Sequence, residues 1–131
     1  MSYWLLKSDP ETYGWEDLKA APQQTDCWDG VRNYQARNFL RDMKIGDLAF
    51  FYHSRISPPA IMGIVRVVKE AYPDPTQFDS RSPYFDPKST RENPRWVMVD
   101  IQYQQDFFPP ITLPELREVP GLENMVLLQK G

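Results

Sequence analysis

The strongest constraint on the fold is the alternation of side chains between positions 96 and 103. One face of this segment carries Val97, Val99, Ile101 and Tyr103, and the other carries Met98, Asp100 and Gln102. A period of two is that of a β-strand with one face on the core. We therefore predict a half-buried antiparallel strand over Trp96–Tyr103.

Three further runs of apolar residues predict strands. They are Tyr3–Lys7, ended by Ser8-Asp9-Pro10, and the pair Asp47–His53 and Ala60–Lys69, joined by Ser57-Pro58-Pro59. Gly63 inside the third run indicates a bulge or a close approach of backbones. A last strand is expected over Met125–Gln129.

Two helices are predicted in the N-terminal half. Trp15–Ala21 ends at Pro22, and Asn33–Met43 carries an apolar stripe of Ala36, Phe39, Leu40 and Met43. Asn33 is expected to cap this helix and Gly46 to end it. A short helix is also expected near Pro114–Glu118.

The order of these elements lacks the βαβ rhythm of a doubly wound sheet. We predict a single α+β domain over residues 1–131, built as a small, mostly antiparallel barrel or curled sheet with a few helices. Residues 70–95 hold five prolines and no periodicity, so this long loop is expected to be functional or a lid.

Charge and residue counts exclude several classes of protein. The net charge is −3, which argues against binding to nucleic acid or membrane through bulk positive charge. One cysteine, Cys27, and one histidine, His53, allow neither an internal disulfide nor an all-Cys/His zinc site. No apolar run has the length of a signal peptide or membrane span, so a soluble intracellular protein is expected.

The common hydrolase, transferase and nucleotide-binding motifs are absent from the sequence. Cys27 and His53 would be a nucleophile and base if they met, although Cys27 also fits as a small buried side chain. The aspartates fall in polar turns, where Asp commonly binds its own backbone.

The segment Trp28–Asn38 reads WDGVRNYQARN and begins a locally basic helix. Arg32, Arg37, Arg41 and Lys44 face only Asp42, a local balance of +3. Arginines beside a helix N-terminus can form a binding site for an anion such as phosphate. The alternative interpretation is that these basic residues are simply the solvated polar face of the helix. Flat surfaces for stacking on a base are offered by Trp4, Trp28 and the Tyr84-Phe85 pair.

Several segments together resemble the EVE-domain family. They are YWLLKSDP (3–10), CWDGVRNYQARNFLR (27–41), FFYHS (50–54), VKEAYPD (68–74) and NPRWVMVD (93–100). The resemblance implies a PUA-like pseudo-barrel of about five or six mostly antiparallel strands, related to YTH and ASCH domains. It implies no cofactor or metal, and it associates the chain with 5-methylcytosine-type bases. Family members usually continue into another strand and a C-terminal helix, so the resemblance also implies that this chain is truncated.

The resemblance also predicts which residues form the site. The expected base pocket contains Lys7, Ser8, Trp28, Asn33, Tyr34, His53, Ser54 and Tyr84. In it Trp28 and Tyr84 are the aromatic walls and Asn33 reads a ring edge, while Arg32, Arg37 and Lys88 hold phosphates.

The prediction is therefore a non-enzymatic reader of a modified base, a monomer in the cytoplasm, or in the nucleus of a eukaryote. Two alternatives stay open. One is an RNA-binding module for modified tRNA or rRNA. The other is a small-molecule-binding or enzymatic domain that uses Cys27 and His53 in the same pocket.

Overall fold

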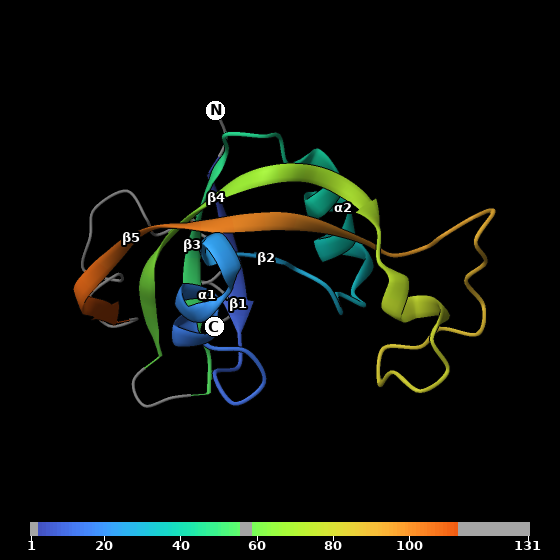
Figure 1. The fold of residues 1–131 in the computed structure, drawn as a ribbon, viewed down its shortest axis with the longest axis horizontal. Coiled ribbons are helices and arrows are strands. Elements are labelled where there is room, and N and C mark those ends of the chain that lie inside the picture. Colours follow the sequence, from blue (N-terminus) through green and yellow to red (C-terminus); the bar gives the residue numbers. More distant parts are fainter. Residues whose placement is uncertain (1–2, 56–58, 113–131) are drawn as a thin grey trace.

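A computed structural model describes residues 3–55 and 59–112. Within these residues the chain forms one five-stranded mixed sheet in the order β1-β3-β4-β5-β2 (Figure 1). The strands are β1 (Tyr3–Ser8), β2 (Thr25–Cys27), β3 (Leu48–His53), β4 (Ala60–Pro73) and β5 (Val97–Thr112). The predicted α+β class is confirmed.

The first strand pairs in parallel with β3, and all the other pairs are antiparallel. Four register shifts interrupt the ladder between β4 and β5, and such irregularities bend and twist a sheet. Gly63 lies at one of them. A Cβ atom there would lie 2.2 Å from the backbone oxygen of Gln105 and 2.4 Å from the indole of Trp15, so the predicted close approach is confirmed.

Both long strands extend beyond their predicted ends. The sequence predicts strands to Lys69 and Tyr103, whereas β4 reaches Pro73 and β5 reaches Thr112. The added residues pair with residues of the other strand that the sequence did predict, for example Tyr72 with Met98 and Gln105 with Ile64. Long-range pairing therefore sets these ends, because the local sequence has no regular alternation there.

Two helices, α1 (Trp15–Ala20) and α2 (Tyr34–Asp42), pack against the sheet. The predicted cap of α2 is confirmed, since the Asn33 carboxamide oxygen accepts from the Ala36 N–H at 2.9 Å. The stripe is buried at Leu40 and Met43, but Phe39 stays 44% exposed beside Trp4. The helix ends at Asp42 with Met43 as its C-cap, so Gly46, the predicted stop, lies beyond the helix in a separate turn.

The core lies between the sheet and these helices. Its most deeply buried apolar side chains are Leu18, Phe51, Val65, Val67, Val99 and Ile101, while Ile61 is buried in a second, smaller cluster with Tyr52. Strand β5 supplies the predicted apolar face, but Met98 on the opposite face is buried as well. The sheet is therefore covered on both faces at this point.

The segment between β4 and β5 forms a separate lobe beside α2, coloured yellow to orange in Figure 1. It begins with a short 3-10 helix, η2 (Pro75–Phe78). A second one, η1 (Pro22–Gln24), follows α1. The predicted helix near 114–118, the predicted strand 125–129 and most of the 57–59 loop lie outside the described residues. None of the helices described is long and apolar enough to cross a membrane.

Candidate functional site

A pocket of about 660 Å³ lies beside the carboxyl end of β1. It is formed by the loop after β1, by β2 with the turn that follows it, and by one tyrosine of the lobe. Its lining residues are Lys7, Ser8, Asp9, Thr12, Tyr13, Asp26, Cys27, Trp28, Asp29, Gly30, Val31, Arg32, Asn33 and Tyr84. A volume of this size suits a small ligand or a single base.

The half-buried indole of Trp28 is one rigid wall of this pocket. It meets the ring of Phe51 edge-on at 5.4 Å between centroids and the ring of Tyr13 edge-on at 6.4 Å. Its backbone N–H donates to the Val99 oxygen at 2.7 Å, which continues the pairing of β2 with β5. Core and sheet contacts therefore fix the indole before any ligand arrives.

Tyr84 reaches the pocket from the lobe, and Gly30 makes room for it. Gly30 has φ of +76°, and a Cβ atom there would lie 2.7 Å from the Tyr84 ring. The backbone turn and the close approach thus both require glycine at this position. Arg32 donates through Nε to the Tyr84 carbonyl at 3.0 Å, and its guanidinium lies 5.6 Å from the centre of the Tyr84 ring.

A buried carboxylate, Asp74, joins the turn after β2 to the lobe. Its Oδ2 accepts from the Gly30 N–H at 2.8 Å and from Arg32 at 3.1 Å, and its Oδ1 accepts from the Thr76 N–H at 2.8 Å. Burial alone would raise the pKa of Asp74, but these hydrogen bonds outweigh it and hold the pKa below its usual value. Asp74 therefore acts as an ionised anchor under the pocket.

Gln77 organises the rest of the lobe from its interior, where it is fully buried. Its amide nitrogen donates to the carbonyls of Asp74 and Trp96 at 2.7 and 2.8 Å. Its amide oxygen accepts from the Ser89 hydroxyl at 2.6 Å and from the Trp96 N–H at 3.1 Å. All four hydrogen-bonding positions of the side chain are used, so the lobe is an ordered structure although its sequence has no periodicity.

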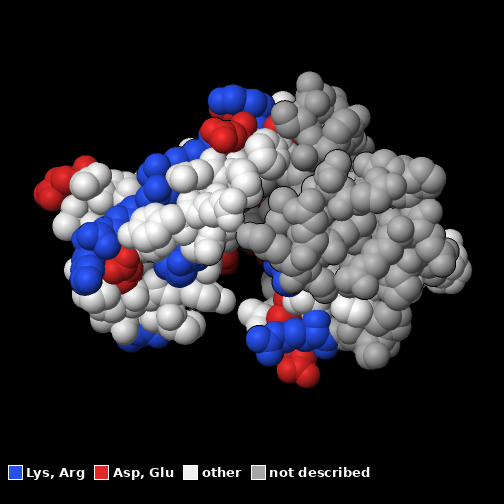
Figure 2. All heavy atoms as spheres, turned by 180° about the vertical axis from the view of Figure 1, so that it is seen from behind, with Lys and Arg blue, Asp and Glu red and all other residues white. Residues whose placement is uncertain are grey.

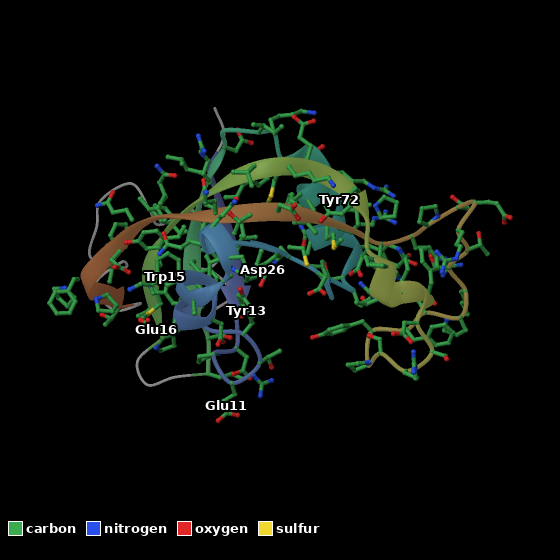
Figure 3. All side chains as sticks on the ribbon, in the orientation of Figure 1. Glu11, Tyr13, Trp15, Glu16, Asp26 and Tyr72 are labelled. Carbon is green, nitrogen blue, oxygen red and sulfur yellow. The ribbon has the colours of Figure 1, made fainter. Side chains whose placement is uncertain are left out.

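Three carboxylates line the pocket. Asp26 accepts from the Tyr13 hydroxyl at 2.7 Å, and Figure 3 shows these two side chains close together below β2. Asp9 lies 3.7 Å from the exposed Arg55. Burial, and after it the charge of Asp74, raises the pKa of Asp29.

Six of the residues predicted for the site line this pocket: Lys7, Ser8, Trp28, Arg32, Asn33 and Tyr84. Arg32, for which a phosphate contact is predicted, forms its hydrogen bonds within the protein. It donates to the carbonyls of Val31 and Tyr84, to Asp74 and to Thr76, which uses four of its five N–H groups. The structure thus gives Arg32 a positioning role.

His53 and Ser54 do not line the pocket. The imidazole of His53 is buried, and its Nε2 accepts from the Trp15 N–H at 3.0 Å at the start of α1. Burial lowers the pKa of His53. Ser54 donates from its backbone N–H to the Ser8 carbonyl at 2.9 Å, so it supports a lining residue.

Tyr34, Arg37 and Lys88 lie outside the pocket as well. The Tyr34 ring stacks on Trp96 at 4.8 Å, and the Arg37 guanidinium lies 4.8 Å from the centre of the Tyr34 ring. Arg37 also donates to the carbonyl of Arg95, and Lys88 is exposed in the lobe. Figure 2 shows Lys and Arg along one side of the described back face, with Asp and Glu between them.

The structure argues against a Cys27–His53 catalytic pair. Burial, and after it the charge of Asp29, raises the pKa of the Cys27 thiol to about 11, so little thiolate exists at neutral pH. The Nε2 of His53 is occupied by the Trp15 N–H. In the described part of the chain, no three His, Cys, Asp or Glu side chains are grouped so that they could hold a metal ion.

Sequence reasoning missed Tyr13, Asp29, Asp74 and Gln77. Asp29 and Gly30 lie inside the WDGVRN block, so their neighbourhood with Trp28 was a usable signal. Asp74 and Gln77 gave none, because a buried amide or carboxylate in a loop has the same local sequence as a solvated one. The roles of Asp74 and Gln77 are seen only from their hydrogen-bond partners in the folded chain.

Comparison with known proteins identifies a matching family and similar sequences. A family model described as "EVE domain" matches residues 2–131. Human thymocyte nuclear protein 1 is 50% identical over 146 residues, covering 98% of this chain and 65% of the relative. Its mouse counterpart is 53% identical over 125 residues, covering 88% of this chain and 55% of the relative. The chain thus spans about half to two thirds of these relatives.

Two solved structures share the fold closely. One is human THYN1 protein in complex with 5-methylcytosine-containing DNA, with a TM-score of 0.90, 50% identity, and coverage of 99% of this chain and 86% of the other. The second is a protein from Pseudomonas syringae, with a TM-score of 0.91, 47% identity and the same coverage.

Proposed function

Because the chain belongs to the EVE domain family, we propose that it is a non-enzymatic module that binds DNA and accepts a flipped 5-methylcytosine-type base. The base would enter the pocket lined by Trp28 and Tyr84. The observation that carries the proposal is this pocket with the aromatic side chains of Tyr13, Trp28 and Tyr84, in a fold shared with a human relative solved on 5-methylcytosine-containing DNA.

The energetics of base flipping are consistent with this pocket. Extrusion of a base costs a few kcal/mol, and stacking on an aromatic ring returns about 1–3 kcal/mol for each base. Trp28 is held by Phe51 and Tyr13, so the stacking surface needs no reordering on binding. A methyl group in an apolar corner would add about 0.8 kcal/mol.

Phosphate contacts would come from outside the pocket. Arg37 and Lys88 are our candidates. Arg32 is not one, because four of its five N–H groups bind within the protein, whereas two of the three hydrogen bonds of Arg37 go to the adjacent exposed Asn38. The chain carries a net charge of −3, so few phosphates would be neutralised and affinity would fall only gently with salt.

The test is titration of oligonucleotides that differ in one base: cytosine, 5-methylcytosine or 5-hydroxymethylcytosine. We expect tighter binding of a modified base, and we expect Tyr84→Ala to weaken binding by about tenfold through lost stacking. Phe85→Ala is the matched control, because Phe85 is the neighbouring exposed aromatic and does not line the pocket. Equal affinity for all three bases, unchanged in Tyr84→Ala, would refute the proposal.

Ribonucleotide versions of the same oligonucleotides test the RNA alternative, since the 2′-hydroxyl distinguishes the two polymers. Preferential binding of the ribo-oligonucleotides would favour it. A catalytic use of Cys27 would require turnover that Cys27→Ser abolishes. The cytoplasmic or nuclear location and the monomeric state stay predictions, to be checked by microscopy of a tagged chain and by light scattering.

A further inference from the structure

The three carboxylates that line the pocket differ in how many hydrogen bonds and ion pairs they already form within the protein. Asp26 accepts from the Tyr13 hydroxyl and the Cys27 N–H, and Asp9 accepts from the Glu11 N–H and faces Arg55. Asp29 has no ion pair and accepts no hydrogen bond from another residue within 3–55 and 59–112. It is the lining carboxylate with acceptor capacity left for a ligand.

Asn33 offers the opposite group at the same turn. Its amide oxygen accepts from the Ala36 N–H at 2.9 Å and caps α2, which fixes the orientation of the amide. The amide nitrogen is the end of the side chain that the helix does not use, and an amide nitrogen only donates. Asn33 lines the pocket together with Asp29.

The pocket therefore presents an acceptor at Asp29 and an oriented donor at Asn33. Cytosine has an exocyclic amino group beside ring nitrogen N3, that is, a donor beside an acceptor. Thymine has a carbonyl oxygen and an N3–H in the same places, so its pattern is reversed. A carboxylate opposite the carbonyl oxygen of thymine would be an acceptor facing an acceptor.

Resting on the function proposed above, we propose that Asp29 and Asn33 make the pocket selective for the 4-amino edge of cytosine-type bases. Asp29 accepts from the amino group, and the Asn33 amide donates to the adjacent ring acceptor. Selection of the amino edge is separate from recognition of the 5-methyl group, which apolar contacts would read.

Four bases separate these two selections. Single-stranded DNA of one sequence carries cytosine, 5-methylcytosine, uracil or thymine at one position. Cytosine and uracil differ only at this edge, in the 4-amino or 4-carbonyl group and the proton on N3, as do 5-methylcytosine and thymine. The methyl group alone separates cytosine from 5-methylcytosine and uracil from thymine. Each selection is thus measured twice within one set of affinities.

We expect the protein to bind each amino base at least tenfold more tightly than its keto counterpart. In Asp29→Asn the amide can either accept or donate, so both ratios are expected to fall below about threefold while the methyl preference persists. Asp79→Asn is the matched control, because it removes an exposed carboxylate that does not line the pocket and is expected to keep the tenfold ratio. Asn33→Asp keeps a good helix cap but loses the donor, and is expected to weaken binding of 5-methylcytosine by about tenfold.

Each result has a defined meaning. If the protein binds thymine as well as 5-methylcytosine, or if Asp29→Asn keeps the tenfold ratio, the inference is wrong even when the methyl preference is present. If the amino preference is present without any methyl preference, the inference holds and the proposed recognition of 5-methylcytosine fails. Unchanged thermal unfolding of Asp29→Asn and Asn33→Asp confirms that the folded state is being compared.

Discussion

Replacing Asp74 with alanine tests how the pocket is assembled. The carboxylate is fully buried, and it accepts hydrogen bonds from the Gly30 N–H, the Thr76 N–H and the Arg32 guanidinium. The Thr76 hydroxyl also donates to this carboxylate, so in Asp74→Ala four donors lose their acceptor at the same time. Because Gly30 and Arg32 lie under Tyr84, the change also reaches the pocket wall.

The size of the effect follows from the partners that are left. A donor that stays buried without an acceptor costs about 1–3 kcal/mol, and loss of one member of a buried ion pair costs about 3–5 kcal/mol. The Arg32 side chain is 21% exposed, so water will partly satisfy it and the ion-pair contribution is reduced. We expect Asp74→Ala to lower the free energy of unfolding by about 3–4 kcal/mol.

Urea unfolding at pH 7, followed by tryptophan fluorescence, measures this change. Asp79→Ala is the matched control. Asp79 is in the same lobe, its side chain is 51% exposed, and its loss is expected to cost less than about 1 kcal/mol. A loss below about 1 kcal/mol for Asp74→Ala with an unchanged slope would refute the anchoring role.

The same anchor predicts a pH dependence. Asp74 has its pKa below the usual value in the folded state, so its contribution is present above about pH 4, the unfolded pKa, and is lost as the pH falls through the folded pKa. The stability difference between the protein and Asp74→Ala should therefore shrink on acidification. A difference that stays constant down to strongly acidic pH would contradict this assignment.

Three further predictions concern other parts of the molecule. Burial lowers the pKa of His53, so the unfolded chain binds more protons, and stability should fall as the pH drops below about 6.5; His53→Gln should flatten this part of the melting profile, and an unchanged profile would exclude His53 as its source. Gly63→Ala should lower the free energy of unfolding, measured in urea, by about 3 kcal/mol, because the new Cβ would lie 2.2 Å from the backbone oxygen of Gln105. An unchanged free energy of unfolding would show that the backbone moves to make room for the methyl group. Lys88→Ala should reduce the slope of log binding affinity against log salt concentration by about 1, without changing the base preference. An unaltered slope would mean that Lys88 does not contact phosphate.

Local signals explain which elements were predictable. The cap at Asn33 and the alternation in β5 depend on residues within a few positions of each other, so the sequence predicted them. The ends of β4 and β5 were missed, because polar residues such as Gln105 and Asp106 continue the strand only through pairing with β4. The parallel pairing of β1 with β3 was likewise invisible locally.

The site was predictable in part for the same reason. Trp28, Gly30 and Asn33 are neighbours in the chain, so the pocket-forming turn was visible as one motif. His53 was expected at the pocket because the family resemblance placed the end of its strand there, yet its imidazole accepts from the Trp15 N–H, which lies 38 residues away. A polar residue gives no sign in the sequence of which distant partner will satisfy it.

Composition, capping and periodicity by themselves determined the α+β class, the main strands, the two helices and the stretch that holds the site. Tertiary structure alone decided that Arg32 holds Tyr84, that Asp74 anchors the turn and that Asp29 keeps acceptor capacity in the pocket. Arg32 and Tyr84 are 52 residues apart, and Gly30 and Asp74 are 44 apart. Helix caps and strand periods arise within a few residues, whereas the satisfaction of buried charges depends on which segments the folded chain brings together.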